Sequence, residues 1–222
     1  MKRQIVSKTI ICVVLLFTAY SRATSQQTIN NADLNQRIEL HLSKVTLMHA
    51  LGILSVQHRV PTGIEYSAED KNEPKLYLEG SSSLKEILDS IVKQEPLYRW
   101  ELVDGVINFV PVRNRDLFFE SLLNTTVSNY DPGKWTIKFK LRDAIGSTPE
   151  VKKLLESKNV ELAKYRDYVY YPSIYTPKEP PDLRMSNTTV RGILNRIIKV
   201  SEHKSWAIGW RKGEKNVFSI WL

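Results

Sequence analysis

Residues 83–100, SLKEILDSIVKQEPLYRW, contain the pattern that decides the fold. Apolar side chains recur there at the i, i+3, i+4, i+7 and i+8 spacing of one helical face, and polar residues occupy the opposite face. Ser83 is a suitable N-cap, and Glu86 three residues later completes a capping box. Pro96 then ends the helix. The stretch therefore predicts an amphipathic helix that leads directly into a strand.

A hairpin is predicted immediately after this helix. Apolar and polar residues alternate along residues 98–102, as in a half-buried strand. The dipeptide formed by Asp104 and Gly105 favours a tight turn in which Gly105 takes a positive φ angle. Residues 106–110 are then expected to form the return strand. The repeating unit of the chain is thus a helix followed by a two-stranded hairpin.

The same pattern returns near the C-terminus as residues 189–206, TVRGILNRIIKVSEHKSW, without a gap between helix start and tryptophan. Trp100 and Trp206 should therefore occupy equivalent places, each on the first strand after its helix and packed over the helix. A third, weaker copy of the helix lies at residues 46–54. Burial of one apolar stripe contributes roughly 8–15 kcal/mol before chain ordering, which offsets most of it. Each unit therefore needs partner elements, and we expect larger blocks.

The first 25 residues have the composition of a secretory signal peptide. Basic residues precede an apolar run at positions 9–20, and small residues follow it. The run is shorter than the roughly 20 residues of a spanning helix, so no membrane span is expected after cleavage. The only cysteine, Cys12, lies inside this segment, so the mature chain has no disulfide. These features predict a bacterial protein that is periplasmic or secreted.

The charge of the mature chain is modest. Removal of residues 1–25 takes away four basic residues, Lys2, Arg3, Lys8 and Arg22, and lowers the formal net charge from +8 to +4. The remaining charges are interspersed, without a basic run, so no nucleic-acid partner is expected.

The chain is expected to be α+β, with two small sandwich-like blocks of β-α-β-β-α-β-β type. Residues 26–33 are interpreted as a flexible lead-in and residues 34–112 as the first block. Residues 113–222 are interpreted as a second α+β domain, a diverged copy of which only the C-terminal part is retained. Within it, residues 148–157 are predicted to be helical, and residues 135–141 are predicted to be a strand unless a helix begins near Leu141.

The first block resembles a known family. VTLMHAL at 45–51, KLYLEGSSSLKEIL at 75–88 and YRWELVDGVINFV at 98–110 are similar to the short N-terminal domain shared by secretins and TonB-dependent receptors. The resemblance covers about residues 34–112 and departs from the family in the charged loop at 69–74. It implies a periplasmic interaction module and does not imply a channel.

The candidate binding residues are tyrosines that precede a proline-rich segment: Tyr168, Tyr170, Tyr171 and Tyr175. Flat aromatic faces suit a glycan or a peptide, although an ordinary strand followed by a loop explains the same pattern. No metal site is predicted, because the four histidines lack ligand spacing. No catalytic residues and no cofactor are predicted either, and no Gly-x-Ser-x-Gly motif is present.

These observations favour a non-enzymatic periplasmic module for protein–protein interaction or envelope assembly, with an envelope protein as partner. One alternative is a glycan- or peptidoglycan-binding module that uses the tyrosine-rich loop. The other alternative is an enzyme of an unrecognised kind.

Overall fold

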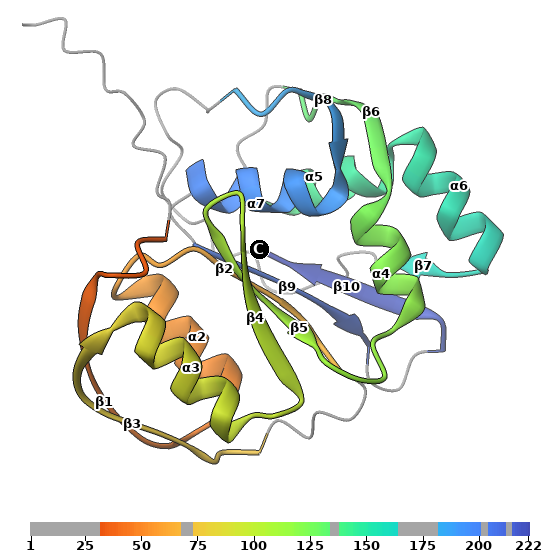
Figure 1. The fold of residues 1–222 in the computed structure, drawn as a ribbon. Coiled ribbons are helices and arrows are strands. Elements are labelled where there is room, and N and C mark those ends of the chain that lie inside the picture. The colour runs from red at the N-terminus through yellow and green to blue at the C-terminus, as the bar shows by residue number, and fades with distance from the viewer. Residues whose placement is uncertain (1–31, 68–72, 134–137, 164–181, 201–203, 212–214) are drawn as a thin grey trace, which may run out of the picture.

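The structure, a computed structural model, describes residues 32–67, 73–133, 138–163, 182–200, 204–211 and 215–222. Six helices and ten strands form in these residues, so the predicted α+β class is confirmed (Figure 1). The predicted signal peptide and most of the lead-in lie outside the described residues.

The first block has the predicted element order. Antiparallel β1 and β3 form a two-stranded sheet, and β4, β5 and β2 are neighbours in a larger sheet. Helices α2 and α3 lie between the two sheets (Figure 1). The elements are β1 (Arg37–Val45), α2 (Leu47–Val56), β2 (Thr62–Glu65), β3 (Leu76–Ser83), α3 (Leu84–Gln94), β4 (Tyr98–Val103) and β5 (Val106–Pro111).

The second block repeats this whole order, with a pair of helices where the first block has α2. Strands β6 and β8 pair antiparallel as β1 and β3 do, and β9, β10 and β7 pair as β4, β5 and β2 do. The interpretation that only the C-terminal part is retained was therefore wrong. The elements are α4 (Leu117–Asn124), which connects the blocks, β6 (Thr126–Tyr130), α5 (Lys138–Gly146), α6 (Pro149–Lys158), β7 (Glu161–Leu162), β8 (Met185–Thr189), α7 (Val190–Val200), β9 (Ser205–Trp210) and β10 (Val217–Trp221).

The strand predicted at residues 135–141 is also corrected. Lys138–Gly146 is helix α5, and residues 134–137 lie outside the described part. Leu141 and Ile145 are spaced four apart and are both buried in the second core, so this segment packs one helical face rather than one strand face. The alternative of a helix that opens near Leu141 was the better interpretation.

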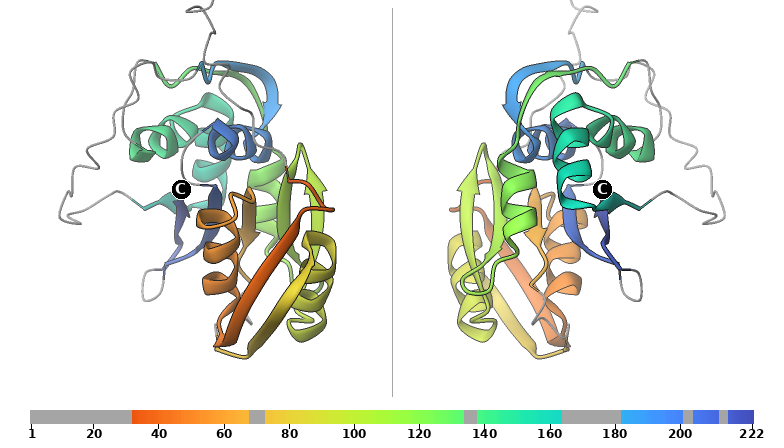
Figure 2. Two further views of the ribbon diagram at one scale, coloured as in Figure 1. Left: turned by 90° about the vertical axis from the view of Figure 1, so that its left-hand side faces the viewer. Right: turned by 90° about the vertical axis from the view of Figure 1, so that its right-hand side faces the viewer.

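The two blocks share one six-stranded sheet with the order β4-β5-β2-β9-β10-β7. Parallel pairing of β2 with β9 joins them. Ile64 of β2 lies in the core beneath α2 and α3, whereas the next residue, Glu65, bonds to α7 on the opposite face. The helices of the two blocks therefore cover opposite faces of the shared sheet, as the side views show (Figure 2).

Equivalent contacts recur in both blocks. The indole Nε1 of Trp100 donates to Asp89 Oδ1 at 2.9 Å, and that of Trp206 donates to Asn195 Oδ1 at 2.8 Å. Asp89 and Asn195 occupy the same position of the repeated helix. The predicted equivalence of the two tryptophans is thus confirmed. Their burial differs, because Trp206 is only 2% exposed and Trp100 is half-buried.

The local signals at the repeated helix and hairpin are also confirmed. The Ser83 side chain accepts from Glu86 N while the Glu86 side chain accepts from Ser83 N, which is the predicted capping box. At the turn, Asp104 has φ 52° and Gly105 has φ 77°. Two successive positive φ angles are those of a type I′ hairpin turn, which matches the right-handed twist of the flanking strands.

Candidate functional site

The tyrosines predicted as a binding surface, Tyr168, Tyr170, Tyr171 and Tyr175, lie outside the described residues, so their role stays a prediction. Among the described residues, no group of three or more His, Cys, Asp or Glu side chains is placed to hold a metal ion. His41 lies on the surface of β1 between Glu79 and Glu39, whose hydrogen bonds raise the pKa of His41. Its strand, β1, belongs to the small sheet that α2 and α3 separate from the shared sheet (Figure 1).

A buried ionic cluster occupies that junction. Glu65, at the end of β2, is 1% exposed. Arg115 donates to both of its carboxylate oxygens, from Nε at 2.8 Å and from Nη2 at 2.9 Å. Arg191 of α7 donates to Glu65 as well, and its other terminal nitrogen donates to Asn108 Oδ1 at 3.2 Å. Both carboxylate oxygens thus accept from arginine side chains, so we interpret this cluster as a structural clamp between the blocks.

Trp206 of the second block packs against the first block at the same junction. Gly63 lies opposite Trp206 in the parallel pairing of β2 and β9. A Cβ atom on Gly63 would come within 2.2 Å of the Trp206 indole ring. Asn195, which accepts the indole hydrogen, also donates to the Val103 carbonyl of the first block at 3.2 Å. The ring therefore lies directly on the backbone of the adjoining block, and only glycine suits that position.

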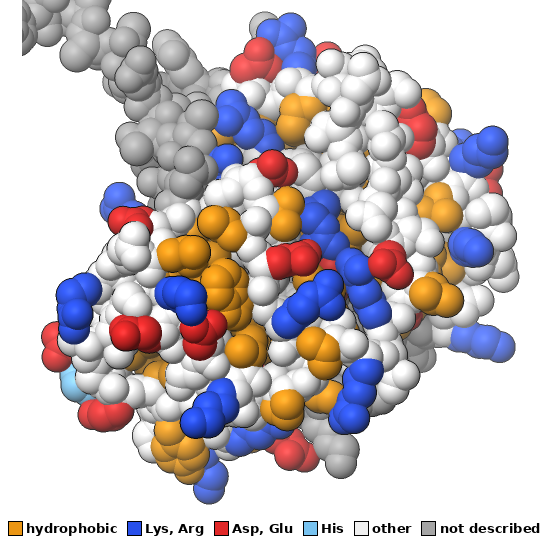
Figure 3. Space-filling model, in the orientation of Figure 1, with side chains coloured by type: hydrophobic (Ala, Val, Ile, Leu, Met, Phe, Trp, Pro, Cys, Tyr) orange, Lys and Arg blue, Asp and Glu red, His pale blue; other side chains and the backbone are white. Residues whose placement is uncertain are grey.

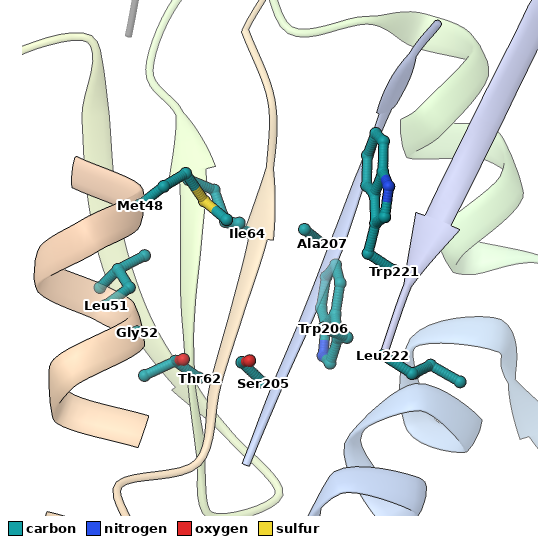
Figure 4. A pocket seen from close by; sticks show the side chains of 10 residues that line it. All are labelled: Met48, Leu51, Gly52, Thr62, Ile64, Ser205, Trp206, Ala207, Trp221 and Leu222. Carbon is teal, nitrogen blue, oxygen red and sulfur yellow. The ribbon is translucent and has the colours of Figure 1, made fainter. Parts of the chain in front are cut away.

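An open apolar groove lies on the other face of this junction (Figure 4). Met48 and Leu51 of α2 form one wall, and Trp221 and Leu222 at the end of β10 lie across from them. Ile64 and Ala207 belong to its floor, on the neighbouring strands β2 and β9. The groove has a volume of about 130 Å³. It is formed by both blocks together, so neither block alone would present it.

Trp221 is the most distinctive side chain of the groove. It is 47% exposed, and its ring meets Tyr66 edge-on with centroids 6.1 Å apart. An exposed tryptophan braced by a second aromatic ring is preorganised for contact, since little side-chain freedom remains to be lost. Sequence reasoning missed this site. The groove joins α2, β2 and β10, and no local pattern relates segments so distant in the chain.

Trp210 has the same strand parity as Trp206 on β9 but not the same burial. Trp206 is 2% exposed, whereas Trp210 is 37% exposed. Its ring packs against Phe118 and Phe119 of α4 at centroid distances of 5.3 and 5.0 Å, and its Nε1 donates to Asp116 Oδ2 at 2.6 Å. It therefore fastens the connecting helix α4 to the sheet and leaves Trp221 as the exposed aromatic of the groove.

Within the described residues, no helix is long and apolar enough to cross a membrane. Comparison of the chain with protein-family models, with curated proteins and with solved structures gave no match.

Proposed function

We propose that this chain is a non-enzymatic interaction module of the bacterial periplasm, which binds an envelope protein through the groove between α2 and β10. The observation that carries the proposal is the exposed Trp221 at an apolar groove shared by both blocks. Tryptophan is among the residues that contribute most to binding at protein interfaces.

The size of the groove favours a protein partner over a small substrate. Sites for small molecules usually enclose about 300–1,000 Å³. The groove holds about 130 Å³, which is below that range and suits apolar side chains that protrude from a partner. Its lining is mainly apolar, with Thr62 and Ser205 as the hydroxyl groups. This lining lacks the paired acid and base groups that hydrolytic or transfer chemistry requires.

The fold supports the same proposal. The resemblance to the short N-terminal domain of secretins and TonB-dependent receptors implies a β-α-β-β-α-β-β order. The first block has this order, and the second block has it with a pair of helices in place of α2. Membership of that family, export by the predicted signal peptide and a periplasmic location are parts of this proposal.

Site-specific cross-linking in the native host tests the function. A photoreactive phenylalanine at position 48 should capture one discrete envelope protein, and one at exposed position 152 on α6 should not. Trp221→Ala should abolish the capture, whereas Trp221→Phe should preserve it in part. Equal capture from positions 48 and 152 would contradict the proposal. Co-pelleting of the protein with isolated cell wall, lost in Trp221→Ala, would instead identify a glycan as the ligand.

A further inference from the structure

Strands β4 and β9 are equivalent in the repeat, but their outer edges differ. At β9, the edge is filled by β2: Thr62 N donates to Lys204 O at 2.7 Å. Tyr66 N likewise donates to Ile208 O at 2.9 Å. β4 ends the six-stranded sheet and, within the described chain, pairs with β5 alone. Because Leu102 corresponds to Ile208, its backbone N–H and C=O point away from β5 at this open edge.

Helix α7 lies over the filled edge of β9. It carries three polar residues, spaced four apart, that donate hydrogen bonds to the first block. Arg191 binds Glu65 of β2. Asn195 and Lys199 donate to the carbonyls of the β4–β5 hairpin, the lysine to Asp104 O at 2.7 Å. This row of α7 therefore recognises the neighbouring block through one carboxylate and two backbone oxygens.

The equivalent row of α3 is Lys85, Asp89 and Lys93, and all three residues are exposed. Lys85 Nζ donates to Asp89 Oδ2 at 2.6 Å. The Lys85 ammonium and the Trp100 indole both donate to Asp89 and lower its pKa. Two lysines against one aspartate leave this row with a net positive charge, which favours an acidic ligand.

The apolar positions beside the two edges show the same contrast. Trp206 and Ile208 are 2% and 0% exposed, whereas Trp100 is half-buried and Leu102 is 44% exposed. Val92 is also less buried than its equivalent, Ile198. Figure 3 shows apolar side chains gathered on the surface between α3 and β4, with lysine, arginine and acidic side chains around them. The first block thus exposes the surface that the second block buries against a strand.

We propose that the edge of β4, together with the exposed row of α3, receives an extended segment of a partner polypeptide. This rests on the proposed function and names the chemistry of the partner. The internal pairing sets the pattern: Gly63 lies opposite Trp206, and Glu65 lies opposite Ile208. The partner segment runs parallel to β4. It places glycine opposite Trp100 and an acidic residue two positions later, within reach of Lys85.

A peptide with the sequence of residues 60–66, VPTGIEY, is the probe, because it reproduces the strand that fills the equivalent edge. NMR titration of the isotope-labelled full chain should give saturable shifts at the Trp100 indole and at the Leu102 and Lys85 amides. Valine in place of the peptide glycine should weaken binding at least about tenfold through the clash with the indole. Lysine in place of the peptide glutamate should weaken it several-fold.

Protein variants separate edge binding from general charge. Leu102→Pro removes an outward N–H without removing a hairpin hydrogen bond, and it should abolish the shifts. Lys85→Glu, a surface change that spares the fold, should weaken binding, whereas Lys152→Glu on α6 should not. Chemical-shift changes confined to residues of α7 and β9, or the absence of any saturable change, would overturn the inference. So would dimerisation of the chain through this edge, which would replace the partner with a second copy.

Binding at the β4 edge and binding at the groove can be tested separately. If a partner is captured at position 48 and its capture is unchanged by Leu102→Pro and Lys85→Glu, the function stands and the β4 edge is not used. If no partner is captured while the peptide binds β4, the groove is the wrong surface and the edge is the right one.

Discussion

Trp100 and Trp206 make the same hydrogen bond to the same helix position, yet only Trp206 lies in a sealed core. Trp206→Ala should therefore cost about 3–5 kcal/mol of unfolding free energy, because it removes a large buried ring and leaves a cavity. Trp100→Ala should cost less than about 2 kcal/mol, because the ring is half-buried. Urea denaturation of both variants measures the difference. Equal losses of unfolding free energy would show that the edges of β4 and β9, beside the two rings, are equally covered.

Glu65 is a buried carboxylate that pairs with two arginines, Arg115 and Arg191. Glu65→Gln leaves Arg115 and Arg191 close together without their carboxylate, so the variant should lose about 3–5 kcal/mol of stability. Glu120→Gln is the matched control, since Glu120 also pairs with Arg115 but its side chain is 41% exposed. Solvent screens that pair, and its loss should cost under about 1 kcal/mol. Similar losses in thermal or urea denaturation would contradict the role of Glu65 as a buried clamp.

At the scale of elements, the β4–β5 turn depends on Gly105. Gly105→Val forces a β-branched residue to a φ of 77° and should destabilise the chain by roughly 1–2 kcal/mol. Gly52 of α2 is the matched control, because a Cβ built there meets no atom within 4 Å apart from its chain neighbours and its own helix backbone. Gly52→Ala should instead stabilise the chain, by up to about 1 kcal/mol. Urea denaturation of the two variants should give shifts of opposite sign, and a neutral Gly105→Val would refute the turn assignment.

The elements that the sequence predicted well are those with strong local signals. The capping box at Ser83, the apolar stripe of α3 and the Asp104–Gly105 turn act over a few residues, so they can be read directly. Residues 138–146 were harder, because alternating and helical spacing overlap near Leu141. The pairing of β2 with β9 was not predictable, since it joins strands from opposite halves of the chain.

The candidate sites, like the secondary structure, could be predicted only where the signal in the sequence is local. Tyrosine density drew attention to residues 168–175, whereas the groove of Met48 and Trp221 forms only after the two blocks meet. The open edge of β4 was likewise hidden in the sequence. The repeat marks Leu102 and Ile208 as equivalent positions, but only the strand order shows that one edge is filled and the other is open.

Two copies of one block share a sheet, and among the described residues the first copy leaves open the edge that the second copy has filled with β2. Each copy of the repeated helix stands over its own edge, with Arg191 engaged at one and Lys85 exposed at the other. Leu102 and Ile208, which are equivalent in the repeat, therefore place their backbone amides at an open edge and at a filled edge of the same sheet.

Amide hydrogen exchange of the intact chain, measured by NMR, distinguishes the open edge of β4 from the filled edge of β9. The Ile208 amide points at β2 and should be protected to nearly the global unfolding free energy, because β9 lies inside the sheet. The Leu102 amide at the open edge should exchange orders of magnitude faster, although it occupies the same position in the repeat. Equal protection of the two amides, or faster exchange at Ile208, would contradict the account.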